Sequence, residues 1–238
     1  VAIDDGGRVY VTDGGEFHVA VFTSAGAPVA TIGRKGKGPG EFEYPTGPVV
    51  GRDGALYVRN MSSVSRFVAD PKIGALGRFD RAFTGPTMSP WMSKLPTVID
   101  RTGRLHFPLE WGQDDGLTYN AFQRFTLDGR ALDSIPVPMH PTARSAWASV
   151  MVSARSGRMV PGLNVVPFHP LPVFTISAVG TVISSPSDVY ALQETDARRQ
   201  VVRQMRREVR PTPIPAAERA DSVKALARRL DSLTVPLS

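Results

Sequence analysis

The chain has 238 residues, 42% of them hydrophobic, which is enough to bury a sizeable core in one large domain or two small ones. It has no cysteine, which excludes disulfides and cysteine-based zinc sites, and no apolar run near the roughly 18 residues of a membrane span. The net charge of +6 resides in residues 198–238, which hold 10 basic and 4 acidic residues, so any electrostatic function belongs to this segment.

The first predicted element is a hairpin at the start of the chain. Residues 3–11 read IDDGGRVYV, with two apolar stretches around Gly7. Because glycine readily adopts the positive φ of a tight turn, this pattern is typical of a β-hairpin. The strand pattern begins at Val1 with no signal peptide before it, so we expect the natural chain to extend further upstream.

This hairpin recurs along the chain, at residues 50–58, 99–107 and, more weakly, 176–184. The turn glycines are 47, 49 and 77 residues apart, and they are Gly7, Gly54, Gly103 and Gly180. Each copy continues with two further strand patterns joined by a polar turn. Four short strands at a period in the forties are typical of a propeller blade. We therefore predict an all-β fold, a β-propeller with four recognisable four-stranded blades over residues 1–210.

The long third spacing indicates an insertion at about residues 139–170, rich in Pro, Ser, Met and Val. It could form an extra hairpin or a long loop over one face. Its methionines and Trp147 are interpreted as packing residues rather than as a ligand site.

A second unit, residues 211–238, begins with the stiff sequence PTPIP and continues as a predicted helix. Pro215 suits the first turn of a helix, and apolar residues recur at helical spacing. We expect this amphipathic helix to pack on the propeller through Val223, Leu226, Ala227 and Leu230.

The second copy resembles the NHL repeat of six-bladed β-propellers. The resemblance rests on GKGPGEF at residues 36–42, Pro45, DGALYV at residues 53–58, and Arg66-Phe67. The proline-rich strap and helix after the fourth copy resemble a group of exported bacterial propellers, which implies an extracytoplasmic location. Six blades are implied, so we expect the present chain to lack blades and to expose a sheet edge open to self-association. The alternative is a ring closed by unrecognised strands in the insertion.

Some enzymes related to this family, lactonases and lyases among them, hold a divalent metal at the channel. The four histidines of this chain show no paired metal-binding spacing, and His106 replaces the tyrosine of the sister copies. The predicted loop at residues 110–115 carries the candidates Glu110, Trp111 and Asp114, although the spacing matches no EF-hand-like ligand pattern. We therefore assign no metal, cofactor or catalytic residue.

The corresponding loops of the first two copies hold Asp13 and the pair Arg59 and Asn60. These residues are candidates for contact with a protein, peptide or glycan at one face of the propeller. In the NHL pattern the equivalent Asp or Asn usually orders its loop, and that reading stays open. The function predicted is a non-enzymatic binding scaffold, with a metal-dependent lyase or lactonase as the alternative.

A second alternative is polyanion binding by the arginine run at residues 198–210, with the candidates Arg203, Arg206 and Arg207. Such binding would be steeply salt-dependent. The run has no aromatic residue for base stacking, which counts against nucleic acid. A solvated outer strand is the simpler interpretation.

Overall fold

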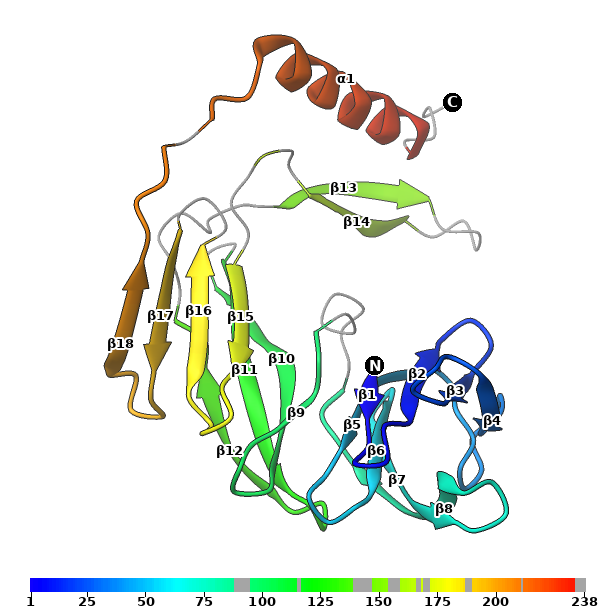
Figure 1. The fold of residues 1–238 in the computed structure, drawn as a ribbon. Helices are drawn as coiled ribbons and strands as arrows, with labels where there is room; N and C mark the ends of the chain where they lie inside the picture. Colours follow the sequence, from blue (N-terminus) through cyan, green and yellow to red (C-terminus); the bar gives the residue numbers. More distant parts are fainter. Residues whose placement is uncertain are drawn as a thin grey trace.

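The computed structural model describes residues 1–87, 95–114, 117–138, 147–153, 159–165, 168, 172–186, 190–210 and 212–233 of the chain. In this part, four antiparallel sheets of four strands are accompanied by one two-stranded hairpin and one C-terminal helix (Figure 1). In each four-stranded sheet the strands lie side by side in chain order. This is the up-and-down order of propeller blades, and the predicted all-β propeller fold with four blades is confirmed.

Within each blade, the strands follow the chain from the first strand at one edge of the sheet to the fourth strand at the other edge. Blade 1 consists of β1 (Ala2–Ile3), β2 (Val9–Asp13), β3 (His18–Phe22) and β4 (Pro28–Ile32). Blade 2 consists of β5 (Pro45–Val50), β6 (Leu56–Asn60), β7 (Ser63–Asp70) and β8 (Ala75–Thr84). Blade 3 consists of β9 (Val98–Ile99), β10 (Arg104–Asp114), β11 (Leu117–Thr126) and β12 (Ala131–Pro136). Blade 4 consists of β15 (Pro172–Ile176), β16 (Val182–Pro186), β17 (Ala191–Thr195) and β18 (Val201–Arg206).

The same turn joins the first two strands of every blade. The four turn glycines have φ angles of 76°, 68°, 77° and 84°, which favour glycine over other residues. Each glycine N–H donates to the carbonyl three residues earlier, at 2.9 to 3.0 Å. The four glycines predicted to be equivalent therefore occupy the same position in the same kind of turn. They are Gly7, Gly54, Gly103 and Gly180.

Blade 2 reaches the turn geometry of blade 1 through a different residue. Gly51 stands where blade 1 has Asp4, and a Cβ atom on it would lie 2.4 Å from Asp53 Oδ1. The Asp53 carboxylate thus fills the space of the missing side chain. It accepts a hydrogen bond from the Tyr57 hydroxyl at 2.7 Å, as Asp4 does from Tyr10 at 2.8 Å.

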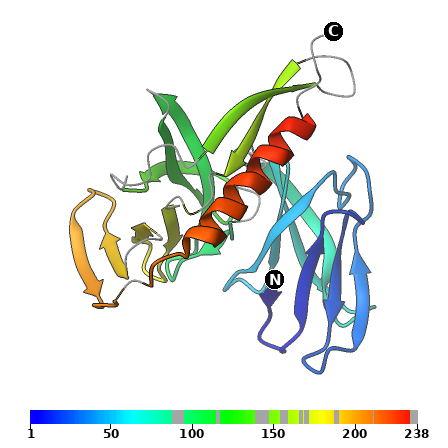
Figure 2. The ribbon, with the colours of Figure 1, turned by 90° about the horizontal axis from the view of Figure 1, so that it is seen from above.

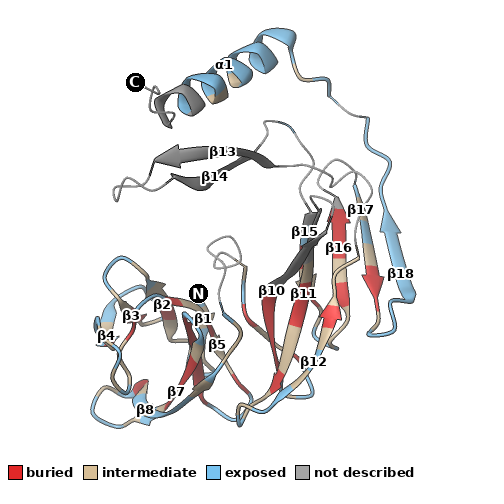
Figure 3. Ribbon diagram, turned by 180° about the vertical axis from the view of Figure 1, so that it is seen from behind, coloured by how far each residue is buried: buried red, intermediate tan, exposed pale blue. Residues whose placement is uncertain are grey.

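Apolar cores fill the spaces between successive blades, and Figure 3 shows the buried residues along the facing strands. Between blades 1 and 2 the core includes Tyr10, Val19, Phe42, Leu56 and Phe67. Between blades 2 and 3 it includes Ala55, Tyr57, Val64, Leu105, Phe107 and Phe125. Between blades 3 and 4 it is formed by Phe122, Ile135, Phe174, Ile176 and Val182. Each blade therefore depends on its neighbour to cover its apolar face.

The insertion contains the extra hairpin that was one of the two alternatives. Strands β13 (Trp147–Ser153) and β14 (Met159–Val165) pair in antiparallel register from Trp147 and Val165 to Ser153 and Met159. Figure 1 shows this hairpin above the blades.

The C-terminal helix, α1 (Ala216–Leu233), lies beyond the hairpin, on the far side from the blades (Figure 1). In the described part of the chain, α1 contacts β13 of the hairpin. Val223, which we expected on the packed face, is 55% exposed, while Ser222 and Leu226 are half-buried. The packing of this segment on the propeller stays a prediction. No helix in the described part is long and apolar enough to cross a membrane.

Tyr10 is the buried polar link between blades 1 and 2, which yields a first prediction. Its hydroxyl donates to Asp4 and accepts a hydrogen bond from the Leu76 N–H of β8 at 2.9 Å. Tyr10→Phe leaves this buried N–H without a partner, so we expect a loss of about 1–3 kcal/mol in the free energy of unfolding. Urea denaturation measures it. Tyr190→Phe, at a residue 66% exposed, is the matched control, and equal losses in both variants would refute the role of the link.

Candidate functional site

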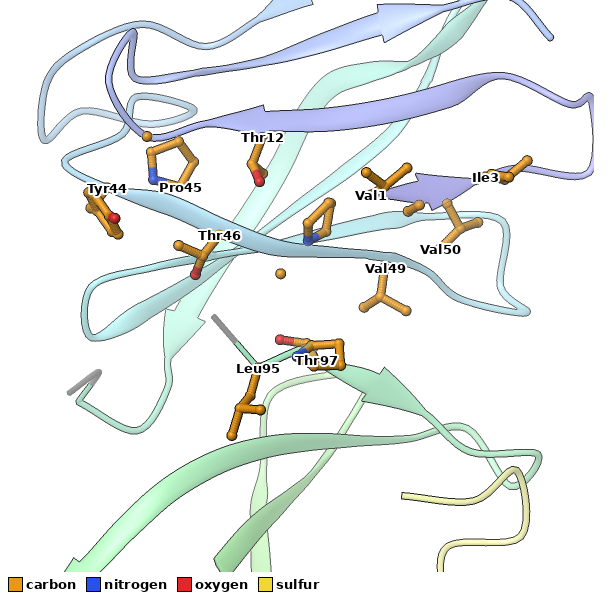
Figure 4. Close-up of a pocket in the computed structure, with 15 residues that line it drawn as sticks. Val1, Ile3, Thr12, Tyr44, Pro45, Thr46, Val49, Val50, Leu95 and Thr97 are labelled. Atoms are coloured by element: carbon orange, nitrogen blue, oxygen red, sulfur yellow. The ribbon is translucent and has the colours of Figure 1, made fainter. Parts of the chain in front are cut away.

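A cavity of about 520 Å³ lies along the first strands of blades 1 and 2 and the residues just before β9 of blade 3. Figure 4 shows Val1, Ile3 and Thr12 on one side of β5 and Leu95 and Thr97 on the other. The lining is formed by Val1, Ala2, Ile3, Thr12, Gly14, Tyr44, Pro45, Thr46, Gly47, Pro48, Val49, Val50, Leu95, Pro96 and Thr97. The volume is that of a site for a small organic molecule.

The inner strands shape this cavity because each is paired on one edge only. In their sheets β1, β5 and β9 hydrogen-bond to β2, β6 and β10, which leaves the other edge unpaired. A bulge between Thr46 and Val49 interrupts the ladder of β5. Gly47, at φ 51°, lies within this bulge. Backbone groups as well as side chains can therefore meet a ligand here.

The side chains that line the cavity are all uncharged. The lining combines aliphatic side chains and prolines with the hydroxyl groups of Thr12, Tyr44, Thr46 and Thr97. Among these fifteen residues there is no Asp, Glu, Lys, Arg or His side chain. Thr97 Oγ1 is buried without a hydrogen-bond partner, and a Cβ on Gly47 would lie 2.7 Å from it. The lining side chains carry no charge and offer neutral hydrogen-bonding groups.

Two predicted site residues order the rim of this cavity. Asn60 Oδ1 accepts hydrogen bonds from the backbone N–H groups of Glu43 and Tyr44, both at 2.9 Å. Asp13 Oδ1 accepts from Gly15 and Glu16 at the same distance. These contacts give Asp13 and Asn60 the loop-ordering role that was left open from the sequence.

Tyr44 is a rim residue that the sequence analysis did not single out. It is 42% exposed, and a Cβ on Gly14 would lie 3.0 Å from its Cε2. The ring therefore lies against the backbone of the loop that Asp13 orders, while Asn60 holds the Tyr44 backbone. The GEFEYP sequence before β5 is the only local signal for it, and that signal does not distinguish Tyr44 from a packing residue.

Arg59, another predicted site residue, lies buried between blades 2 and 3. It is 2% exposed, and it donates from Nη1 to the Pro108 carbonyl at 3.2 Å and from Nη2 to the Pro86 carbonyl at 3.3 Å. Its guanidinium lies 5.7 Å from the centre of the Phe107 ring. Burial lowers the pKa of Arg59 to about 10. The structure thus places Arg59 beneath the loops, where it joins two blades.

The predicted loop of blade 3 is a strand extension. Strand β10 continues to Asp114 and pairs with β11 as far as Leu117, with a bulge after Glu110. The loop prediction was wrong because the β-prone sequence at residues 117–120 extends the pairing. The side chains of Glu110, Trp111 and Asp114 lie outside the described residues. In the described part, no three His, Asp or Glu residues come together as a metal site, and the metal-dependent alternative stays a prediction.

A buried Asp-His pair lies at the turn of blade 3. His106 Nε2 lies 2.9 Å from Asp100 Oδ2. The other carboxylate oxygen, Asp100 Oδ1, accepts hydrogen bonds from the backbone N–H groups of Thr102 and Arg104. Burial lowers the pKa of His106, against the opposing effect of Asp100. Burial alone would raise the pKa of Asp100, but its hydrogen bonds from Thr102 and His106 lower it to about 2. Neutral His106 therefore donates to an ionised Asp100.

The basic run begins in the turn before the outermost strand of blade 4, β18, and continues through and beyond it, and all residues of β18 are exposed. Arg203 Nε lies 3.6 Å from Glu194, and the Arg207 guanidinium lies 5.9 Å from the centre of the Tyr190 ring. Arg206 is exposed. These positions fit both a solvated outer strand and a basic surface.

Comparison with known proteins adds no assignment of activity. No protein-family model matches the sequence, and no curated protein matches it. Among solved structures, virginiamycin B lyase from Staphylococcus aureus is similar at 13% identity and a TM-score of 0.43, over 87% of this chain and 69% of that chain. A protein of unknown function from Bacteroides caccae is similar at 12% identity and a TM-score of 0.40, over 84% and 72% of the two chains. At these identities and TM-scores, the similarity says nothing about what this chain binds.

The buried pair makes stability depend on pH. His106 takes up a proton in the unfolded chain near pH 6.5 and in the folded chain only at lower pH, so acidification below pH 6.5 favours unfolding. The lowered pKa of Asp100 stabilises the folded state, and this stabilisation is lost only as the pH falls below the ordinary pKa of 3.8. Urea midpoints from pH 8 to pH 5 should therefore fall in the native chain, and less steeply in His106→Gln. His18→Gln is the control, and an equal slope in the native chain and His106→Gln would contradict this account.

Proposed function

We propose that this chain is a binding module that takes an uncharged small organic molecule in the cavity along β1, β5 and the segment before β9. The observation that carries the proposal is the lining itself, which pairs aliphatic surface with neutral hydroxyl and backbone groups. A charged ligand would lose its hydration there, and no lining side chain would offer it an opposite charge. A ligand with apolar surface and a few hydroxyl, ester or amide groups matches the lining.

Binding rather than turnover is the activity that this lining supports. General acid-base catalysis needs a titratable group within reach of the ligand, and a metal centre needs carboxylate or imidazole ligands. The side chains of the fifteen lining residues supply neither. The proposal keeps the binding scaffold predicted from the sequence but moves its ligand from the outer loops to the inner strands. An NHL-type, exported propeller is part of the proposal. The NHL type rests on the resemblance of residues 36–67, and export rests on the resemblance of the proline-rich strap and helix.

A variant of the rim tests the proposal directly. We expect uncharged fragments of a mixed library to bind the native chain in ligand-detected NMR, and charged fragments of similar size not to bind. Tyr44→Ala removes an exposed ring from the rim and should weaken binding by about tenfold, within the range of a well-placed aromatic contact. Its unfolding midpoint should change little, since the ring is 42% exposed.

Tyr190→Ala removes an exposed tyrosine of blade 4, remote in sequence from the cavity, and serves as the matched control. It should bind fragments as the native chain does. Equal loss in both variants, or binding confined to charged fragments, would refute the cavity as the site.

A further inference from the structure

The cavity follows the backbone edge of β5 rather than one face of its sheet. Its lining at β5 is a run of consecutive residues, 44–50. Because side chains alternate between the two faces of a strand, one face could supply only every second residue of this run. The cavity therefore lies along an edge of the strand. Since β6 pairs with one edge of β5, the edge at the cavity is the unpaired one.

The turn of blade 2 determines which backbone groups reach this free edge. The Gly51 N–H donates to the Ala55 carbonyl at 2.8 Å, so these two residues form a hydrogen-bonded pair. Two residues back along the register, Val49 lies opposite Tyr57. Hydrogen-bonded and non-hydrogen-bonded pairs alternate along an antiparallel ladder. Val49 therefore bonds to β6, whereas the N–H and the C=O of Val50 both point to the free edge.

The free edge of β5 has few N–H donors besides that of Val50. Pro45 and Pro48 have no N–H, and the ladder is interrupted between Thr46 and Val49. Val50 follows this bulge in the regular part of the strand, and it is half-buried. Its N–H and C=O thus present a donor and an acceptor side by side at the cavity.

The neighbouring blade leaves this donor-acceptor pair open. Strand β1 contacts β5 but belongs to a different sheet, and Figure 2 shows blades 1 and 2 side by side. In β1 the same alternation directs the N–H and C=O of Ile3 outward, because the Asp4 N–H donates to the Arg8 carbonyl. Ile3 is 63% exposed, so water competes for its backbone groups. The pair on Val50 is the better shielded of the two.

We propose that the cavity selects ligands with an amide N–H and carbonyl on the same side, as in a lactam or a primary carboxamide. The ligand carbonyl accepts from the Val50 N–H, and the ligand N–H donates to the Val50 carbonyl. Both groups are neutral and so suit the uncharged lining. A lactone would cover the Val50 carbonyl without offering it a donor, which is unfavourable. This inference rests on the proposed function and adds the class of ligand.

The test compares three ligands that carry the same phenyl group, namely a δ-lactam, its N-methyl derivative and the corresponding lactone. Ligand-detected NMR titrations of the full chain measure their dissociation constants. The lactam should bind about fivefold or more tightly than either analogue, the factor that one net hydrogen bond supplies. Equal binding of all three overturns this inference but leaves the cavity as a ligand site. If no uncharged ligand binds, the proposed function fails as well.

Val50→Pro removes the N–H and places a ring carbon where its hydrogen was, so the lactam can no longer approach the edge. Proline fits here because this N–H is not used in the ladder to β6. The preference for the lactam, measured as a ratio of dissociation constants, should fall below about twofold, less than the contribution of one hydrogen bond. Persistence of the full preference in this variant would overturn the inference.

Val50→Ala is the matched control, since it shortens the side chain and keeps both backbone groups. It should retain the preference for the lactam even where the absolute affinities change. Loss of the preference in Val50→Ala would assign it to the side chain and contradict the proposed pairing. Circular dichroism establishes that both variants fold, and the ligand series decides the inference on the native chain in either case.

Discussion

The structure depends on one hydrogen bond that each of the first three blades repeats. A carboxylate at the turn accepts from a ring on the second strand, and the ring is buried where the next blade packs. The pairs are Asp4 with Tyr10, Asp53 with Tyr57, and Asp100 with His106, at 2.8, 2.7 and 2.9 Å. In blade 1 the same hydroxyl also meets the backbone of blade 2. The bond therefore fixes both the turn of one blade and its distance to the next.

This constraint also explains the candidate site. Because the turns and the cores between blades hold the sheets in place, the first strand of each blade is presented with one edge unpaired. The loops that Asp13 and Asn60 order bring Tyr44 to the rim of the same space. The cavity is thus a product of blade packing, and its uncharged lining follows from the apolar character of strands such as PTGPVV.

The sequence was sufficient to predict the repeated turns and strands of the blades. It was not sufficient to predict features that arise from contacts between distant segments. The turn glycines carry their own conformational requirement, so Gly7 and its equivalents marked the blades. Burial of Arg59 depends on carbonyls of Pro86 and Pro108, which no local pattern reveals. The helix could be predicted from periodicity, but its contact with β13 could not, because β13 lies in the insertion that has no counterpart in the other repeats. The cavity was missed because its lining is spread over 97 residues and carries no reactive side chain.

The most direct test of the proposed function is a crystal structure of the chain with the tightest-binding uncharged fragment. Bound density along β5, in contact with Tyr44 and with Leu95 or Thr97, is the result that the account predicts. Density on the outer loops of the blades, with the space along β5 filled by side chains, would contradict it.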